Sequence, residues 1–284
     1  MKTVEEIVAI YGARAQATDL LKSKMRTLRD YYNGDVIVPL PEINADEQSA
    51  VANLLAQGLD QTAMRIASTR PDIYCPPSDP SRKRSRDNSQ ITRKALFGWW
   101  EHSRMDLQLA KRARQLIGYS TTVTQLRFNA DTGCPEWHLR DPLTAYPATL
   151  LGVDDMLPRD CIFAYERPLG WLHNNYPQIA QVFQSDSDAG PDTGVELIEY
   201  VGPEETVLIA MRGPVNTGLF ATSSYDSGEN VVVELERAEN RVGVTPIVCA
   251  QRISLDSSQG QFDGILGMYQ MQARLMALEV IAVQ

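Results

Sequence analysis

Few of the side chains that carry out catalysis in proteins occur here at a catalytic spacing. The three histidines, His102, His138 and His173, stand apart and belong to no HExxH or HxxxH pattern. A metal site would have to be assembled from distant parts of the chain. The adjacent carboxylates Asp154 and Asp155 could bind Mg²⁺ in a nuclease, but two acids in GVDDMLPRD are more typical of a solvated turn.

Two motifs that mark common enzymes are missing from the sequence. It contains neither a GxxxxGK[ST] phosphate-binding loop nor a GxSxG nucleophile turn. We therefore expect no enzymatic activity and neither a cofactor nor a catalytic metal, with a nuclease as a remote alternative.

Two further clusters could contact nucleic acid. RKRSR at 82–86 places four cations in five residues, which could neutralise phosphates, but the flanking Asp79 and Asp87 favour a solvated approach to a helix. Trp99 and Trp100 could stack on bases, although packing against the core and a neighbouring element is the favoured interpretation. Met268, Met271 and Met276 at helical spacing predict ordinary core.

Composition indicates a globular protein without a strong affinity for nucleic acid. The 284 residues are 43% apolar, which is enough for one large domain or two ordinary ones. With 36 acidic and 27 basic residues the formal charge is −9, which argues against a surface that wraps DNA tightly.

The cysteines and the hydropathy pattern predict the compartment. Cys75, Cys134, Cys161 and Cys249 form no CxxC pair, so neither a zinc knuckle nor a disulfide framework is indicated. No run of 18 uncharged apolar residues occurs, and the N-terminus lacks a signal-peptide pattern. We expect a soluble protein in a reducing compartment, with no membrane contact.

The first 118 residues have a helical period. A capping box at Thr3 and Glu6 predicts a helix to Tyr32 that stops at Asn33-Gly34 and continues as an extended arm. Further helices are expected from Asn44 to about 66, at 88–102, and from an Asp106 cap to Gly118. Residues 70–80 are predicted to form an extended linker.

After Gly118 the period changes to two. Strands are expected at 121–128, 134–140, 161–167, 195–201, 206–212, 231–237 and 245–251, with a short helix within 171–183 and a polar loop at 185–194. Past Gly260 a helical period returns and lacks a stop signal, so we expect the natural chain to continue beyond Gln284. The predicted fold class is α+β, divided into a helical part (1–118), an antiparallel β-rich part (119–258) and the start of a long helix (259–284).

The order of these motifs resembles that of bacteriophage portal proteins, especially those of long-tailed phages. YYNGD is followed by Asn53 in a helix leading to RPDI, then by the Trp pair, and then by LAKRARQLIGYSTTVTQLRFNADTGCPEWHLRDPLTAYP. NNYPQ, VELIEYV, GVTPIV and DGILGMYQMQARL come after these. The resemblance covers nearly the whole chain as short motifs, although family members are longer, with a clip, a returning stem helix and a crown.

The resemblance implies which residues matter. Those that match the family's structural turning points or are candidates for subunit contacts are Tyr31, Tyr32, Asn33, Gly34, Trp99, Trp100, Gly118, Tyr119, Asp141, Pro142, Gly243 and Pro246. None has a catalytic role in the family. The arms at 33–43 and 70–80 are expected to reach a neighbouring subunit.

The resemblance also implies a function. The family forms a ring, usually of twelve subunits, at the unique capsid vertex. Terminase drives double-stranded DNA through its channel, and head-to-tail adaptors and the major capsid or scaffold protein bind around it. The helical and β-rich parts would form the wing, with the last helix approaching the stem. Such a protein would assemble in the host cytoplasm and end in the virion. The alternative is another phage structural protein, either a head-to-tail adaptor or a minor capsid protein.

Overall fold

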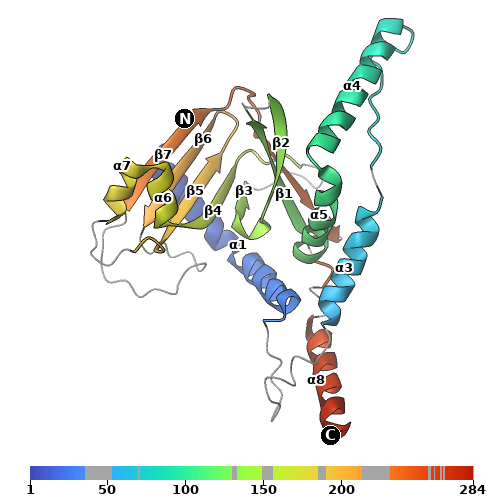
Figure 1. The fold of residues 1–284 in the computed structure, drawn as a ribbon, viewed down its shortest axis with the longest axis vertical. Coiled ribbons are helices and arrows are strands. Elements are labelled where there is room, and N and C mark those ends of the chain that lie inside the picture. The colour runs from blue at the N-terminus through green and yellow to red at the C-terminus, as the bar shows by residue number, and fades with distance from the viewer. Residues whose placement is uncertain are drawn as a thin grey trace. The chain divides into compact units, whose positions relative to one another are not determined.

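The structure is a computed structural model that describes most of the chain (Figure 1). The described residues are 1–35, 53–69, 71–129, 133–148, 156–184, 190–212, 231–254, 257–258, 260–262, 264 and 266–283. The arm beyond Asp35, the expected helix start at Asn44, and Asp154 and Asp155 lie outside these ranges. The described chain combines helices with antiparallel sheet, which confirms the α+β class.

The chain forms two compact units. The first, here called the sheet unit, contains Met1–Lys24, Val123–Gln125 and Arg140–Ala250. The second, the helical unit, contains Met25–Thr122, Leu126–Leu139 and Gln251–Gln284. Helix α1 (Val4–Asn33) and strand β1 (Thr121–Asn129) each contribute residues to both units. The expected division into three consecutive parts stays a prediction.

The sheet unit is built on five antiparallel strands in the order β3-β4-β5-β6-β7. The strands are β3 (Ala145–Pro147), β4 (Cys161–Pro168), β5 (Gly194–Val201), β6 (Glu205–Arg212) and β7 (Val231–Glu239). The hairpin expected at 195–212 is confirmed, with Ile198 opposite Ile209. The short β3 was not predicted, because three residues carry too little period to be recognised.

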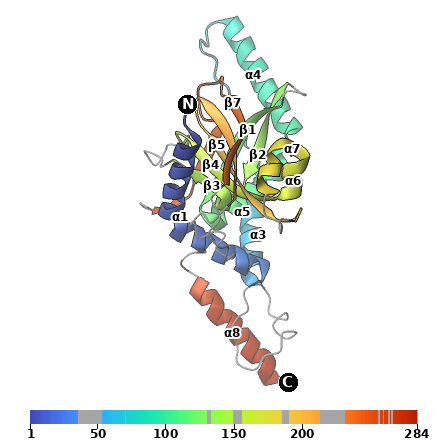
Figure 2. The same ribbon diagram turned by 90° about the vertical axis from the view of Figure 1, so that its left-hand side faces the viewer.

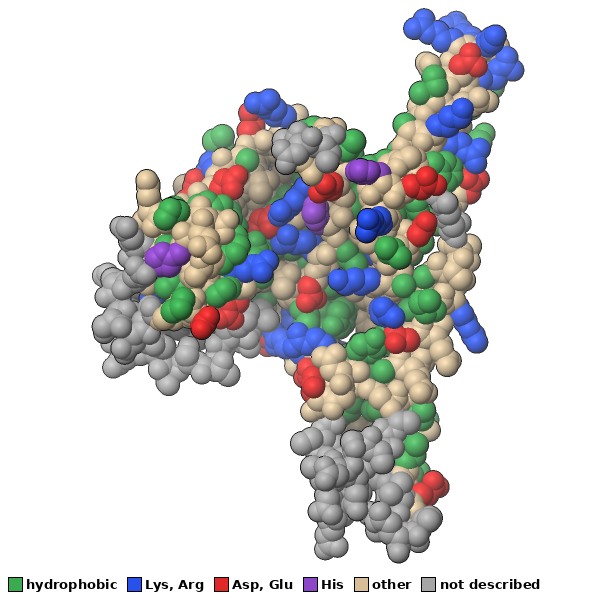
Figure 3. Space-filling model, in the orientation of Figure 1, with side chains coloured by type: hydrophobic (Ala, Val, Ile, Leu, Met, Phe, Trp, Pro, Cys, Tyr) green, Lys and Arg blue, Asp and Glu red, His purple; other side chains and the backbone are tan. Residues whose placement is uncertain are grey.

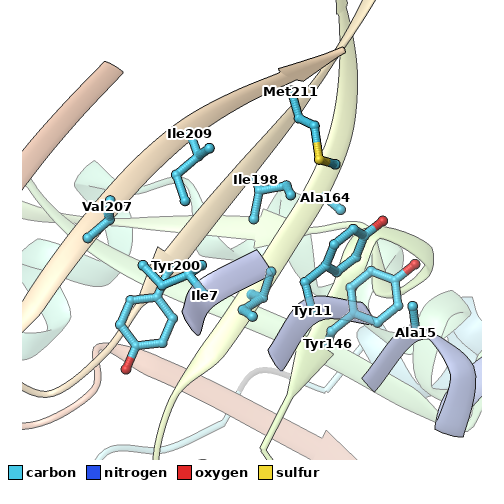
Figure 4. Close-up of a cluster of buried hydrophobic side chains, with 11 residues drawn as sticks. Ile7, Tyr11, Ala15, Tyr146, Ala164, Ile198, Tyr200, Val207, Ile209 and Met211 are labelled. Atoms are coloured by element: carbon cyan, nitrogen blue, oxygen red, sulfur yellow. The ribbon is translucent and has the colours of Figure 1, made fainter. Parts of the chain in front are cut away.

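Helices cover the two faces of this sheet (Figure 2). On one face, Ile7, Tyr11 and Ala15 of α1 pack on apolar side chains of the strands, as Figure 4 shows. These are Tyr146, Ile162, Ala164, Ile198, Tyr200, Val207, Ile209 and Met211. On the other face lie α6 (Leu169–Asn175), α7 (Pro177–Ala180) and the 3₁₀ turn η2 (Gln181–Gln184). The alternation of the strand side chains supplies an apolar surface to both layers.

The helical unit contains α3 (Leu54–Ala67), α4 (Lys83–His102), α5 (Met105–Tyr119), α8 (Leu266–Val283) and the end of α1. Its core consists of Leu28, Tyr31, Leu55, Leu59, Ala63, Ala113, Ile117 and Phe262. Strand β1 lies between β2 (Cys134–Arg140) and β8 (Ile247–Gln251) in a three-stranded sheet whose residues are not confined to this unit. The short strands β9 (Ile253–Ser254) and β10 (Ser257–Ser258) pair with each other.

Several expected helix boundaries are wrong. Asn53 caps α3 and does not lie inside a helix, since its side chain accepts from the Ala56 amide. Helix α4 begins at Lys83, five residues before the expected Asn88. Asp106 lies in the first turn of α5, which is capped by Arg104 in the left-handed conformation. Here the backbone geometry of the α4–α5 turn prevails over side-chain capping preference.

The end of α5 and the start of α8 also differ from expectation. Helix α5 continues past Gly118 to Tyr119, and Ser120 adopts the left-handed conformation. Phe262 precedes α8, which begins at Leu266. The Leu266 amide donates a hydrogen bond to the Phe262 carbonyl at 3.2 Å, at the start of this helix.

Candidate functional site

The stop at the end of α1 is a Schellman motif. The Asp35 amide donates to the Asp30 carbonyl at 2.9 Å, and the Gly34 amide donates to the Tyr31 carbonyl at 3.2 Å. Gly34 has a φ of +82°, a conformation that would be strained for a residue with a side chain. The YYNG segment therefore ends the helix as the sequence predicts.

The two tyrosines before this stop hold separate parts of the helical unit. Tyr31 is buried, its ring meets Tyr269 of α8 edge-on at 5.6 Å, and its hydroxyl accepts from the Gln270 side chain. Tyr32 donates its hydroxyl to Asp60 of α3 at 3.1 Å. Burial, followed by this bond to Asp60, raises the pKa of Tyr32.

Asn53 links α1, α3 and α8. Its amide nitrogen donates to the carbonyls of Tyr31 and Tyr32, and its oxygen accepts from the Ala56 amide and the Tyr269 hydroxyl. One side chain therefore caps the end of α1 and the start of α3. Sequence reasoning placed Asn53 among the matching motifs but missed this role, because the partners on α1 and α8 lie 21 to 216 residues away.

The tryptophan pair packs within the helical unit. The Trp99 indole N–H donates to the Pro135 carbonyl, and its ring lies 5.2 Å from that of Trp137. The Trp100 N–H donates to the Asp106 carboxylate at 2.8 Å. Both indole donors are therefore used inside this unit.

Gly118 lies at a close approach between α5 and two leucine side chains. A Cβ there would lie 3.1 Å from a Leu28 methyl and 3.2 Å from a Leu59 methyl. The glycine lets α5 approach α1 and α3, so its role is steric. Tyr119, next to it, packs against the same core.

The Asp141-Pro142 turn is held by a buried lysine in the sheet unit. Asp141 caps the 3₁₀ turn η1 (Pro142–Thr144) by accepting from the Leu143 amide at 2.9 Å. The Lys22 ammonium donates to the carbonyls of Pro142, Leu143 and Ala145 and lies 4.4 Å from the centre of the Tyr146 ring. No pattern in the sequence indicates this role, because the carbonyls that Lys22 contacts lie 120 to 123 residues away in the chain.

The turn before β8 is a smaller structural feature of the same unit. Gly243 has φ of +74°, and Thr245 donates to the Arg159 carbonyl at 2.6 Å. Pro246 is half-buried and leads into β8 at Ile247.

Buried ion pairs in the sheet unit were not predicted. Asp160 pairs with Arg14, Glu199 pairs with Arg140 at 2.9 Å, and Glu205 pairs with Arg237. Gln125 also donates to Glu199, at 2.9 Å. These carboxylates therefore have their partners inside the fold, as buried charged groups generally do.

The remaining candidates for chemistry are scattered. In the described ranges, no three His, Cys, Asp or Glu side chains lie close enough together to hold a metal ion. His138 lies 3.4 Å from Glu136 at an exposed position on β2. None of the described helices is long and apolar enough to cross a membrane.

Two helices of the helical unit leave large parts of their surface uncovered. On α8, Met268, Met271, Leu275 and Leu278 are 51% to 67% exposed, so the prediction that the methionines form core is wrong for Met268 and Met271. Helix α4 has no buried residue. The linker at 71–80 runs beside it, with the Ser89 hydroxyl donating to the Cys75 carbonyl.

Comparison with known proteins gives no further identification. The chain matches no family model, and no curated protein matches it.

Proposed function

We propose that this chain is the wing and the start of the stem of a bacteriophage portal protein, without enzymatic activity. It would form a homo-oligomeric ring, usually of twelve subunits, at the unique capsid vertex of the virion. The ring would pass double-stranded DNA during packaging and ejection. It would bind terminase, a head-to-tail adaptor and the major capsid or scaffold protein.

The observation that carries the proposal is the exposed stripe on α8. Met268, Met271, Leu275 and Leu278 recur at spacings of three and four, so they lie on one side of the helix. Leu266 and Tyr269 lie about 100° or more around the helix from each of these four residues and contact the core of the helical unit. An apolar stripe opposite the attached face needs a cover, and a second copy of α8 would supply one.

The motif residues support the same proposal through their contacts. Tyr31 and Asn53 belong to the segments that resemble the family, and both bind the first turn of α8. In the proposal these contacts set the direction in which the stem helix leaves the wing. The helix stop and the stem would then be parts of one structural device.

Charge is compatible with a DNA conduit. A ring of twelve chains would carry 12 × −9 = −108 formal charges. A negatively charged channel wall repels the phosphates of DNA and neutralises few of them. The channel would therefore bind DNA weakly and oppose its movement little. DNA could therefore slide past without being held.

The test is the mass and image of the purified protein. We expect light scattering to give a mass about twelve times that of one chain, and negative-stain images to show rings with a central pore. A monomer at working concentration contradicts the proposal. Compact oligomers without a pore would instead favour an adaptor or a minor capsid protein.

Paired variants test the role of α8 in assembly. Met271→Glu/Leu275→Glu places two charges on the stripe and is expected to reduce the mass to that of a monomer while the circular dichroism stays unchanged. Leu20→Glu/Val242→Glu adds the same charges at sites that are 73% and 75% exposed and is the matched control. Equal loss of mass in both variants would contradict a specific role for the stripe.

A further inference from the structure

The cations of this acidic chain are concentrated on the first half of α4. Residues 82–94 contain six basic side chains and one acidic one, Asp87, for a net charge of +5. The rest of the chain then carries −9 − 5 = −14. The six cations are Arg82, Lys83, Arg84, Arg86, Arg93 and Lys94. We call this set the α4 basic surface.

Most of this surface has no ion-pair partner in the part of the chain that the structure describes. Lys83, Arg84, Arg86 and Lys94 are exposed and have no ion pair among the described residues. The other two have exposed partners: Arg82 pairs with Asp79 at 3.0 Å and Arg93 with Asp72 at 2.8 Å. Figure 3 shows Lys and Arg side chains gathered at the end of α4, at the upper right. Exposed pairs of this kind contribute little to stability.

The position of the cations is unfavourable for the helix itself. The first turn of α4 contains no acidic residue, and no side chain caps it. Cations at a helix N-terminus oppose the helix dipole and cost stability. A helix selected only for solubility would carry mixed charges there, so the positive charge points to an external anion.

The spacing fits an extended anion. Arg86, Gln90 and Arg93 follow one line along the helix, with Lys83 and Lys94 beside it. At 1.5 Å per residue, Arg86 and Arg93 are about 10 Å apart along the axis, and Lys83 and Lys94 about 16 Å. A single phosphate or carboxylate could contact only part of this surface, whereas a row of phosphates could contact the cations that share one side of the helix.

Two other polyanionic partners fit less well. A helix that binds a membrane surface needs a continuous apolar face opposite the charges, but here Ser85 and Ser89 bind the linker. A single-stranded nucleic acid needs a series of open aromatic rings for successive bases, whereas here Tyr74 of the linker is exposed and the Phe97 ring already has the Arg93 guanidinium 5.6 Å from its centre.

We propose that the α4 basic surface binds the phosphate backbone of double-stranded DNA, independently of sequence. This contact is distinct from the passage of DNA through a ring channel, and it does not require a ring. It gives the protein a holding surface for DNA in addition to the acidic surface of the rest of the chain.

The experiment measures binding of the full chain to a fluorescently labelled random-sequence duplex by anisotropy over a salt series. If four to six phosphates are neutralised, the plot of log affinity against log salt should have a slope of about −4 to −5. Lys83→Gln/Arg86→Gln removes two unpaired cations from a helix with no buried residue. We expect it to weaken binding at least about 10-fold at low salt and to make the slope less steep by about two.

Controls separate this surface from general charge and from assembly. Lys24→Gln/Arg241→Gln removes the same charge from exposed positions elsewhere and should leave affinity and slope unchanged. Light scattering on each sample reports the oligomeric state, so failure to bind DNA and failure to form rings are read separately. The proposal is overturned if the duplex does not bind at low salt, or if both double variants bind like the original protein. Binding only to vesicles containing phosphatidylserine would also overturn it.

Discussion

The side-chain amide of Asn53 donates to the backbone carbonyls of both Tyr31 and Tyr32, at 2.9 and 3.0 Å. The last carbonyls of a helix have no partner within it. Asn53 therefore satisfies two acceptors of α1 while its own oxygen caps α3 through Ala56. The amide group of one side chain therefore joins the end of α1 to the start of α3.

Replacing Asn53 should separate these two roles. Asn53→Ser keeps an oxygen for the cap but loses both amide donors, whereas Asn53→Ala loses all of them. We expect the alanine variant to lower the free energy of unfolding by about 1 to 3 kcal/mol, with the serine variant between it and the original. Urea unfolding followed by circular dichroism measures the difference. Equal stability of all three proteins would contradict the linking role.

Replacing Lys22 should destabilise the sheet unit. Lys22→Met keeps the aliphatic stem but leaves the carbonyls of Pro142, Leu143 and Ala145 without their shared donor. Because buried acceptors would lose a charged donor, we expect a loss of about 2 to 4 kcal/mol in unfolding free energy. Lys24→Met is the control, since Lys24 is exposed two residues away, and it should change stability by less than about 0.5 kcal/mol. Similar losses in both would rule out the carbonyl contacts as the cause.

The four cysteines should divide into two classes of reactivity. Burial raises the pKa of Cys249 to about 12 and raises the pKa of Cys161 well above its usual value, so few of these thiols are ionised at neutral pH. Cys75 and Cys134 are only half-buried. In the native protein we expect a thiol reagent to modify Cys161 and Cys249 at least about 100-fold more slowly than the other two. Peptide mass spectrometry after timed labelling measures this, and uniform labelling before unfolding would contradict it.

The variant Glu196→Gln should become more stable relative to the original protein as the pH rises. Burial raises the pKa of Glu196, the Tyr11 hydroxyl that donates to it at 2.6 Å opposes this, and nearby Glu166 adds to it. A carboxyl with a raised folded pKa stabilises the fold below its unfolded pKa, and this contribution is lost as the pH rises through the folded pKa. Glutamine stays neutral and can still accept from Tyr11.

The expected result is that the stability of Glu196→Gln relative to the original protein increases as the pH rises above the ordinary pKa of a glutamate side chain. Urea unfolding at several pH values measures this increase. Glu239→Gln on the exposed end of β7 controls for the loss of one negative charge. If the stability difference stays constant or falls as the pH rises, burial does not raise the pKa of Glu196 in the folded protein.

The elements with a long regular period were predictable from sequence alone. Helix α1 carries a period of 3.6, the β5–β6 hairpin consists of two apolar, β-branched-rich runs joined by GPEE, and Thr3, Glu6 and Gly34 mark the ends of α1. The boundaries of α4 and α5 were less well predicted, because the turn between them depends on a left-handed Arg104. No residue preference indicates such a conformation.

The candidate site was only partly predictable. Tyr31, Gly34, Gly118 and Asp141 were found because glycine, aspartate and proline mark turns in the sequence itself. Their partners, among them Lys22, were not found, because a hydrogen bond between residues 120 positions apart leaves no local pattern.

The sequence by itself determined the periods, the turns, the acidic charge and the basic run at 82–86, since each is a property of neighbouring residues. Only the tertiary structure decided which charges are paired, that Met268 and Met271 of α8 face outward, and that four of the six cations on the α4 basic surface have no ion pair among the described residues. The physical reason is that burial and pairing depend on segments far apart in the chain, which meet only when the fold forms.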